Sequence, residues 1–139
     1  MIREFSAGGV CVRRMRGRDY VAAVRVKGGT VLALPKGHVD PGETAAEAAE
    51  REVREEAGVR GELVEKLGDV KYWYSRDGDR VMKVVTFFLF RYRSGRVADH
   101  DHEVDSAEWV PLDDAPRLLA YRGEKQMAEA ALSSLGSGR

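Results

Sequence analysis

The sequence has a single cysteine, no excess of either charge and no long apolar run. Cys11 is the only cysteine in 139 residues, so an intramolecular disulfide is excluded. It lies in the alternating segment GGVCVR, which favours a small buried residue over a nucleophile. Nowhere do about 18 apolar residues follow one another, as a membrane-spanning helix requires. We therefore expect no disulfide framework and no membrane partner.

The charges balance, because Lys+Arg and Asp+Glu each number 23. No overall field then favours long nucleic acids or a membrane surface, and any recognition of phosphate must be local. The opening segment MIREFSAGGV has an early acid and no apolar run typical of a signal peptide, so we expect a cytoplasmic location. With no repeat or linker, the sequence predicts one domain over residues 1–135 and a frayed tail over 136–139.

The segment from Gly37 to Val59, GHVDPGETAAEAAEREVREEAGV, dominates what remains. Thr44 followed by Glu47 forms a capping box, and the alanines that follow are strong helix formers. Gly58 stands where a residue in the left-handed conformation ends a helix. The segment therefore predicts a helix over residues 45–57.

Three glutamates of this helix, Glu52, Glu55 and Glu56, are spaced i, i+3 and i+4 and share one flank. Their mutual repulsion calls for a cation, and hard carboxylate oxygens suit Mg²⁺ or Mn²⁺. Mg²⁺ usually leaves several positions to water and to substrate phosphates. The alternative is a solvated charged face with Glu–Arg pairs.

The whole segment resembles the Nudix box, GX5EX7REUXEEXGU with U aliphatic, and every fixed position matches. The resemblance implies an α/β (α+β) fold, a Nudix-type α/β/α sandwich with a mixed sheet. It also implies a metal-dependent hydrolase of nucleoside diphosphates linked to another moiety. By this resemblance the metal site comprises Gly37, Glu43, Glu52, Glu55 and Glu56.

Arg51, by the same resemblance, orients the glutamates. Its place in the helix agrees, because Glu47 and Glu55 lie four residues before and after it. We therefore expect Arg51 to pair with both.

The rest of the chain reads as strands with a few helices. Residues 94–105 read as a loop, and either Asp113 or Asp114 is expected to cap a short helix that ends by Ala120. Strands are predicted over residues 5–14, 20–26, 30–34, 62–74, 81–92 and 107–111, and an amphipathic helix over residues 124–135.

Glu103, in the polar loop segment DHDHEVD, is a candidate general base for the attacking water. Many Nudix enzymes use a glutamate from the box helix or from a loop late in the chain, and Glu103 resembles the latter. The alternative is a solvated loop. His100 and His102 lack a third soft ligand at a recognisable spacing, so we do not assign a zinc site.

The narrower stretch LPKGHVDPGE resembles the asymmetric diadenosine tetraphosphate hydrolases, which carry PKGH at this point. This branch implies His38 near the scissile phosphate, with Lys36 also at the substrate. Lys83 would bind phosphates, although it also suits a solvent-facing strand position. Tyr74, and less so Tyr72, could stack on a base or pack in the core, and Tyr121 presents the same choice. The implied substrate residues are Lys36, His38, Tyr74, Lys83 and Tyr121.

Four functions compete. The first is hydrolysis of dinucleoside polyphosphates, with diadenosine tetraphosphate giving ATP and AMP. The second is hydrolysis of nucleoside triphosphates such as 8-oxo-dGTP, and the third is cleavage of ADP-ribose, nucleotide sugars or capped RNA ends. The fourth, a non-catalytic regulatory domain, is disfavoured because all three helix glutamates are present. The sequence does not determine the substrate, the preferred metal or the oligomeric state.

Overall fold

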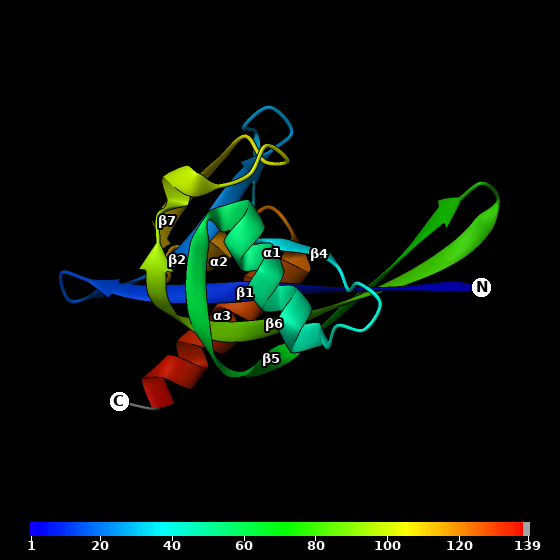
Figure 1. Ribbon diagram of the computed structural model, residues 1–139. Coiled ribbons are helices and arrows are strands. Elements are labelled where there is room, and N and C mark those ends of the chain that lie inside the picture. Colours follow the sequence, from blue (N-terminus) through cyan, green and yellow to red (C-terminus); the bar gives the residue numbers. More distant parts are fainter. Residues whose placement is uncertain (138–139) are drawn as a thin grey trace.

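The computed structural model describes residues 1–137. The strands and helices occur along the chain largely in the order that the sequence pattern predicts, and the strands form a mixed sheet (Figure 1). The elements are β1 (Ile2–Met15), β2 (Arg18–Val26), β3 (Val31–Ala33), β4 (Lys36–His38), α1 (Ala45–Ala57), β5 (Val59–Arg76), β6 (Asp79–Gly95), the 3₁₀ helix η1 (Val97–Asp99), β7 (Ser106–Pro111), α2 (Ala115–Leu118) and α3 (Arg122–Ser137).

The sheet has the order β3-β2-β1-β6-β5, and two strands branch from it, since β4 pairs with β1 and β7 pairs with β2. The β1–β6 pair is parallel, whereas the other pairs are antiparallel, so the predicted mixed sheet is confirmed. The long β5–β6 hairpin turns at Asp77-Gly78 and projects from the body beside the start of β1 (Figure 1).

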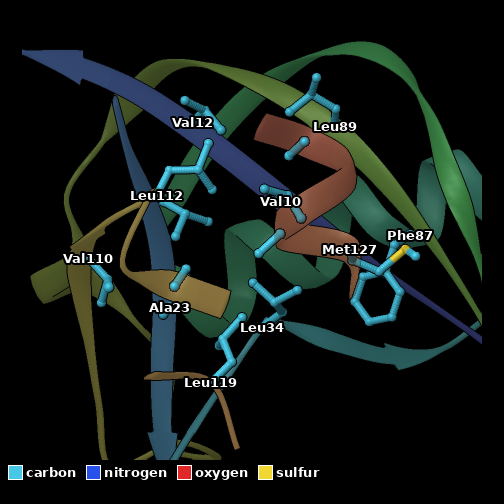
Figure 2. Packing of buried hydrophobic residues seen from close by; sticks show 14 of the residues in the cluster. Val10, Val12, Ala23, Leu34, Phe87, Leu89, Val110, Leu112, Leu119 and Met127 are labelled. Carbon is cyan, nitrogen blue, oxygen red and sulfur yellow. The ribbon is translucent and has the colours of Figure 1, made fainter. Parts of the chain in front are cut away.

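The two faces of the sheet bury two apolar clusters. Alternate residues of β1 divide between them, because successive side chains of a strand point to opposite faces. Val10 packs with Phe87 and Met127 on the α3 side, as Figure 2 shows. Cys11 and Phe90 pack with Val53 on the α1 side. The helices thus cover opposite faces, which confirms the α/β/α sandwich.

Helix α1 begins and ends where local signals predict. The Thr44 hydroxyl accepts the Glu47 N–H at 3.1 Å, and the Glu47 carboxylate accepts the Thr44 N–H at 2.9 Å. Gly58 ends the helix in the left-handed conformation, with φ 76°, and its N–H donates to the Arg54 carbonyl. The capping box therefore occupies the Glu47 carboxylate, so this carboxylate is not available to pair with Arg51.

Three local predictions need correction. Residues 36–38, which no predicted strand covers, form β4 because they pair with β1. Helix α2 ends at Leu118 rather than near Ala120, whose N–H donates instead to the Leu32 carbonyl. Asp114 makes no side-chain capping bond to α2, and it contacts Arg18 at 3.4 Å.

The tail predicted over residues 136–139 is helical as far as Ser137, which ends α3, and the last two residues lie outside the described part of the chain. Across residues 1–137, none of the helices is long and apolar enough to cross a membrane.

Candidate active site

Strand β4 presses its central glycine against α1. Gly37 is in register with Ala7, whose side chain belongs to the apolar cluster on the α1 side. A Cβ atom at Gly37 would lie 2.3 Å from the Glu52 carboxyl carbon. Any side chain at this position would therefore require the Glu52 carboxylate to move.

Arg51 gathers the carboxylates around this contact. Its guanidinium donates two hydrogen bonds to Glu43, from Nε at 2.7 Å and from Nη2 at 2.9 Å. Its Nη1 donates to Glu52 at 2.7 Å and to Glu55 at 3.3 Å, and its Nη2 donates to the His38 carbonyl at 2.9 Å. This fork ties the loop before α1 to the helix.

The expected pair between Arg51 and Glu55 is present, but the pair with Glu47 is not, since Glu47 caps the helix. Glu43 takes its place. Arg51 thus connects three of the carboxylates that the Nudix box assigns to the metal site.

The carboxylates differ in their electrostatics. The hydrogen bond from Arg51 lowers the pKa of Glu43 to about 2. Burial raises the pKa of Glu52 against the opposing hydrogen bond from Arg51. Burial also raises the pKa of Glu56 to about 7, although the Lys36 N–H donates to its carboxylate at 3.0 Å. Desolvated carboxylates crowded together favour a proton or a cation.

The loop that carries Glu103 is tied to α1. The Asp101 N–H donates to the Glu55 carbonyl at 2.8 Å, and the Asp101 carboxylate accepts the Glu103 N–H at 3.1 Å. Val104 is buried in the cluster on the α1 side, while the Glu103 side chain is exposed. Its charge is close enough to contribute to the raised pKa of Glu52. Glu103 is therefore an exposed carboxylate within electrostatic reach of Glu52.

The predicted substrate residues share the other face of the sheet. Lys83 lies opposite Tyr72 across the β5–β6 pair. Ser6 of β1 is in register with His38 of β4 and with Val85 of β6, two residues beyond Lys83. Residues in register, and residues two apart on a strand, point to the same face. Lys83, Tyr72 and His38 therefore belong to one face of the sheet.

A cavity of about 630 Å³ opens on this face between the sheet and the start of α3. Its walls include Tyr72 and Tyr121, which are 40% and 39% exposed. The charged residues that line it are Lys36, Lys71, Arg122, Asp69 and Glu124. Of the predicted substrate residues, His38, Tyr74 and Lys83 do not line it. The Tyr74 hydroxyl instead donates to Glu4 at 2.7 Å. Two aromatic residues for a base and three cations for phosphates suit a nucleotide with several phosphates.

Lys36 connects this cavity with the glutamate cluster. Its N–H binds Glu56 on the α1 side, whereas its ammonium lies 5.1 Å over the Tyr121 ring on the α3 side. One residue of β4 thus bridges the two groups of predicted site residues.

Within residues 1–137, no three His, Cys, Asp or Glu side chains are already arranged as a metal-binding set. Arg51 explains much of this, since it holds the carboxylates of Glu43, Glu52 and Glu55. The donor chemistry nevertheless fits a hard divalent cation, because two desolvated carboxylates lie beside the close approach at Gly37.

A family model described as the NUDIX domain matches residues 3–131, nearly the whole chain. The chain belongs to the Nudix family. Its Nudix box supplies Gly37 on β4, Glu43 before α1, and the arginine and glutamates of α1 itself.

Three curated Nudix relatives illustrate the range of the family. A Mycobacterium tuberculosis protein that carries the name mutator protein MutT4 is 41% identical over 136 residues, 94% of this chain and 55% of that protein. An 8-oxo-(d)GTP phosphatase of Mycolicibacterium smegmatis is 35% identical over 68% of this chain and 28% of its own length. The NAD-capped RNA hydrolase NudC of Salmonella paratyphi C is 34% identical over 78% and 40%. The chain thus spans about half or less of the length of these relatives.

Solved Nudix structures share the fold over nearly all of the chain. The Ap4A hydrolase of C. elegans is 26% identical with a TM-score of 0.69, and the match covers 97% of this chain and 99% of that one. The NUDIX domain of Shewanella oneidensis NrtR, solved with ADP ribose, has a TM-score of 0.74 at 18% identity, covering 97% of this chain and 90% of that one. The second likeness concerns the fold alone.

Of the two stacking candidates on β5, the less favoured Tyr72 lines the cavity and Tyr74 does not. One residue of this part of the molecule was missed from the sequence. Glu124 resembles an ordinary acidic residue in the first turn of a helix, yet it is buried beneath Lys36. No local sequence pattern predicts the contact between Glu124 and Lys36.

Proposed function

We propose that the chain is a divalent-metal-dependent pyrophosphohydrolase of dinucleoside polyphosphates, and that it cleaves diadenosine tetraphosphate to ATP and AMP. The observation that carries this proposal is the bridge at Lys36 between a carboxylate cluster and a cavity with two tyrosines. Nudix hydrolases generally use divalent metals, and Mg²⁺ or Mn²⁺ suits oxygen ligands.

Glu52, Glu55 and Glu56 would hold the metal, with support from Glu43 and the Gly37 backbone. Bound there, a divalent ion neutralises phosphate charge and lowers the pKa of the attacking water. The Arg51 fork keeps the carboxylates of the box together before the metal and the substrate arrive.

Other residues of the chain bind the substrate and move the proton. Tyr72 and Tyr121 offer aromatic surfaces to an adenine, while Lys36, His38 and Lys83 place positive or hydrogen-bonding groups along the phosphates. Tyr74 supports the neighbouring ring of Tyr72, since the ring centroids lie 6.4 Å apart. Glu103 accepts the proton of the water from its exposed loop beside the cluster.

A second candidate is hydrolysis of nucleoside triphosphates such as 8-oxo-dGTP. The two mycobacterial relatives favour it, because one carries the name of a mutator protein and the other of an 8-oxo-(d)GTP phosphatase. Such a substrate has one base and three phosphates. It would occupy less of the proposed site than a substrate with two bases and four phosphates.

A substrate panel with Mg²⁺ or Mn²⁺ separates the candidates. We expect kcat/KM for diadenosine polyphosphates at least about tenfold above that for 8-oxo-dGTP or ADP-ribose, which corresponds to about 1.4 kcal/mol in transition-state binding. The products of diadenosine tetraphosphate should be ATP and AMP. Lys83→Ala should weaken this preference, since a long polyphosphate loses more than a short diphosphate. A panel led by 8-oxo-dGTP or ADP-ribose, or ADP as the only product of the tetraphosphate, selects another candidate.

A further inference from the structure

Glu124 is a buried carboxylate that the proposed reaction does not use. It lies in the first turn of α3 and is only 3% exposed. Its Oε1 accepts the Leu34 N–H at 2.7 Å, and its Oε2 pairs with the Lys36 ammonium at 2.7 Å. A buried carboxylate is costly unless it is paired and hydrogen-bonded, and here both oxygens have partners in the segment just before the Nudix box.

The same segment is also fixed from the opposite side. The Lys36 N–H donates to Glu56 of α1 at 3.0 Å, and the Pro35 carbonyl accepts the Gly9 N–H of β1 at 3.1 Å. Residues 34–36 are therefore held by α1, β1 and α3 together. The Lys36 side chain leaves this fixed backbone toward the cavity rather than from a mobile loop.

The Lys36 ammonium is held at its tip as well. Glu124 accepts one of its three N–H donors, and the Tyr121 ring lies beneath it at 5.1 Å. A lysine side chain is otherwise flexible, and ordering it when a ligand binds weakens the binding. A lysine side chain that is already ordered before the ligand binds avoids this loss of affinity. Two of its N–H donors stay available for phosphate oxygens.

We propose that Glu124 is a positioning residue that holds the Lys36 ammonium over Tyr121 for the phosphates of a nucleotide in the cavity. This rests on the proposed function only in that the cavity is taken to bind nucleotide polyphosphates. Glu124 acts through Lys36 and need not touch the substrate.

The direction of the effect separates this role from a purely electrostatic one. If Glu124 only reduced the positive charge of the cavity, Glu124→Gln would tighten the binding of an anion. If Glu124 positions Lys36, the same change weakens binding, because glutamine still accepts the Leu34 N–H but no longer pairs with the ammonium. Glu124→Asp keeps the charge but is one methylene too short to reach both partners.

The test uses ATP as the probe, titrated by NMR into the full chain in EDTA, so that metal-dependent hydrolysis does not interfere. We expect Kd to rise about three- to tenfold in Glu124→Gln and in Glu124→Asp, and about tenfold in Lys36→Met. In the Lys36→Met background, Glu124→Gln should add less than twofold, because the two residues act as a unit. Glu129→Gln, an exposed position on the same helix, should leave Kd within twofold.

Equal or tighter ATP binding by folded Glu124→Gln, additive effects of the two changes, or no ATP binding by the wild-type chain would overturn the proposal. If Glu124→Gln does not fold, Glu124→Asp carries the test. The wild-type chain supplies a third measurement, since NMR relaxation of the Lys36 ε-methylene should show a rigid side chain, and a mobile one contradicts the role. ATP binding is measured apart from catalysis. Failure to cleave diadenosine tetraphosphate would therefore reject that substrate without deciding the role of Glu124.

Discussion

At the scale of single residues, the glutamates of the Nudix box differ in their surroundings. Glu56 has a pKa raised to about 7 by burial, whereas Glu43 is held near 2 by the hydrogen bond from Arg51. Without a cation nearby, Glu56 is only partly ionised near neutral pH. Glu43 stays ionised and orients Arg51. Identical side chains thus have different roles because their surroundings differ.

Glu56→Gln should keep the fold and lower kcat by a factor on the order of 10³ or more, because it removes a charge from the proposed metal site. Steady-state kinetics with Mg²⁺ measures this, and circular dichroism reports the fold. Glu50→Gln, an exposed change on the same helix, serves as the control and should retain activity. Full activity of Glu56→Gln, or of the wild-type chain in excess chelator, would rule out metal-dependent catalysis at this site.

Glu103→Gln should lower kcat by about 10² to 10⁴ with little change in metal affinity, because glutamine cannot serve as the proposed base for the attacking water. Kinetics and a Mn²⁺ titration separate the two quantities. His102→Gln alters the exposed neighbour in the same loop and should be close to wild type. If Glu103→Gln is as active as the wild-type chain, the general base is a glutamate of α1 instead.

At the scale of elements, the site depends on how closely β4 approaches α1. That distance is set by Gly37, for which any side chain would overlap the Glu52 carboxylate. A three-residue strand carries too little periodicity to be recognised from sequence, and β4 forms because its neighbour β1 is already extended. The helix, by contrast, carries its own start and stop signals.

Gly37→Ala should therefore lower kcat at least about tenfold while leaving most of the stability, because the new methyl group displaces Glu52 and the Arg51 fork with it. Activity and thermal melting are the measurements. Gly136→Ala is the matched control, since a Cβ there meets no atom within 4 Å and alanine favours a helix. Unchanged activity in Gly37→Ala would mean that the close approach has no catalytic role.

At the scale of the whole molecule, one sheet separates the carboxylate cluster from the cavity, and each face has its own apolar core. Cys11 lies in the core on the α1 side, and burial raises the pKa of its thiol from 9.0 to about 12. The thiol is therefore part of the packing, as its place in the alternating segment predicted.

The free energy of unfolding should fall with pH above about 9, because the unfolded thiol ionises there while the folded thiol keeps its proton to about 12. The stabilisation from this group is complete below the unfolded pKa and is lost as the pH rises through the folded value. One proton corresponds to a slope of about 1.4 kcal/mol per pH unit. Denaturant titrations of wild type and Cys11→Ala between pH 8 and about 10.5 isolate the contribution of this thiol to the pH dependence of stability. Equal slopes for the two proteins would contradict the burial of the thiol.

The sequence by itself determined the elements whose signals are local. The two ends of α1 are fixed by Thr44, Glu47 and Gly58, because capping bonds join residues only three or four apart. The spacing of Glu52, Glu55 and Glu56 placed three carboxylates on one flank, since it depends only on helical geometry. The strands predicted over residues 62–74 and 81–92 likewise form the long hairpin.

Only the tertiary structure decided the contacts between distant segments. Arg51 binds Glu43 because the capping box has already taken Glu47, and Tyr72 reaches the cavity because α3 packs over that part of the sheet. Lys36 lies between Glu56 and Glu124, which belong to helices on opposite faces. Such contacts depend on the register of the whole sheet and on which faces the helices bury, and neither is a property of any short stretch of sequence.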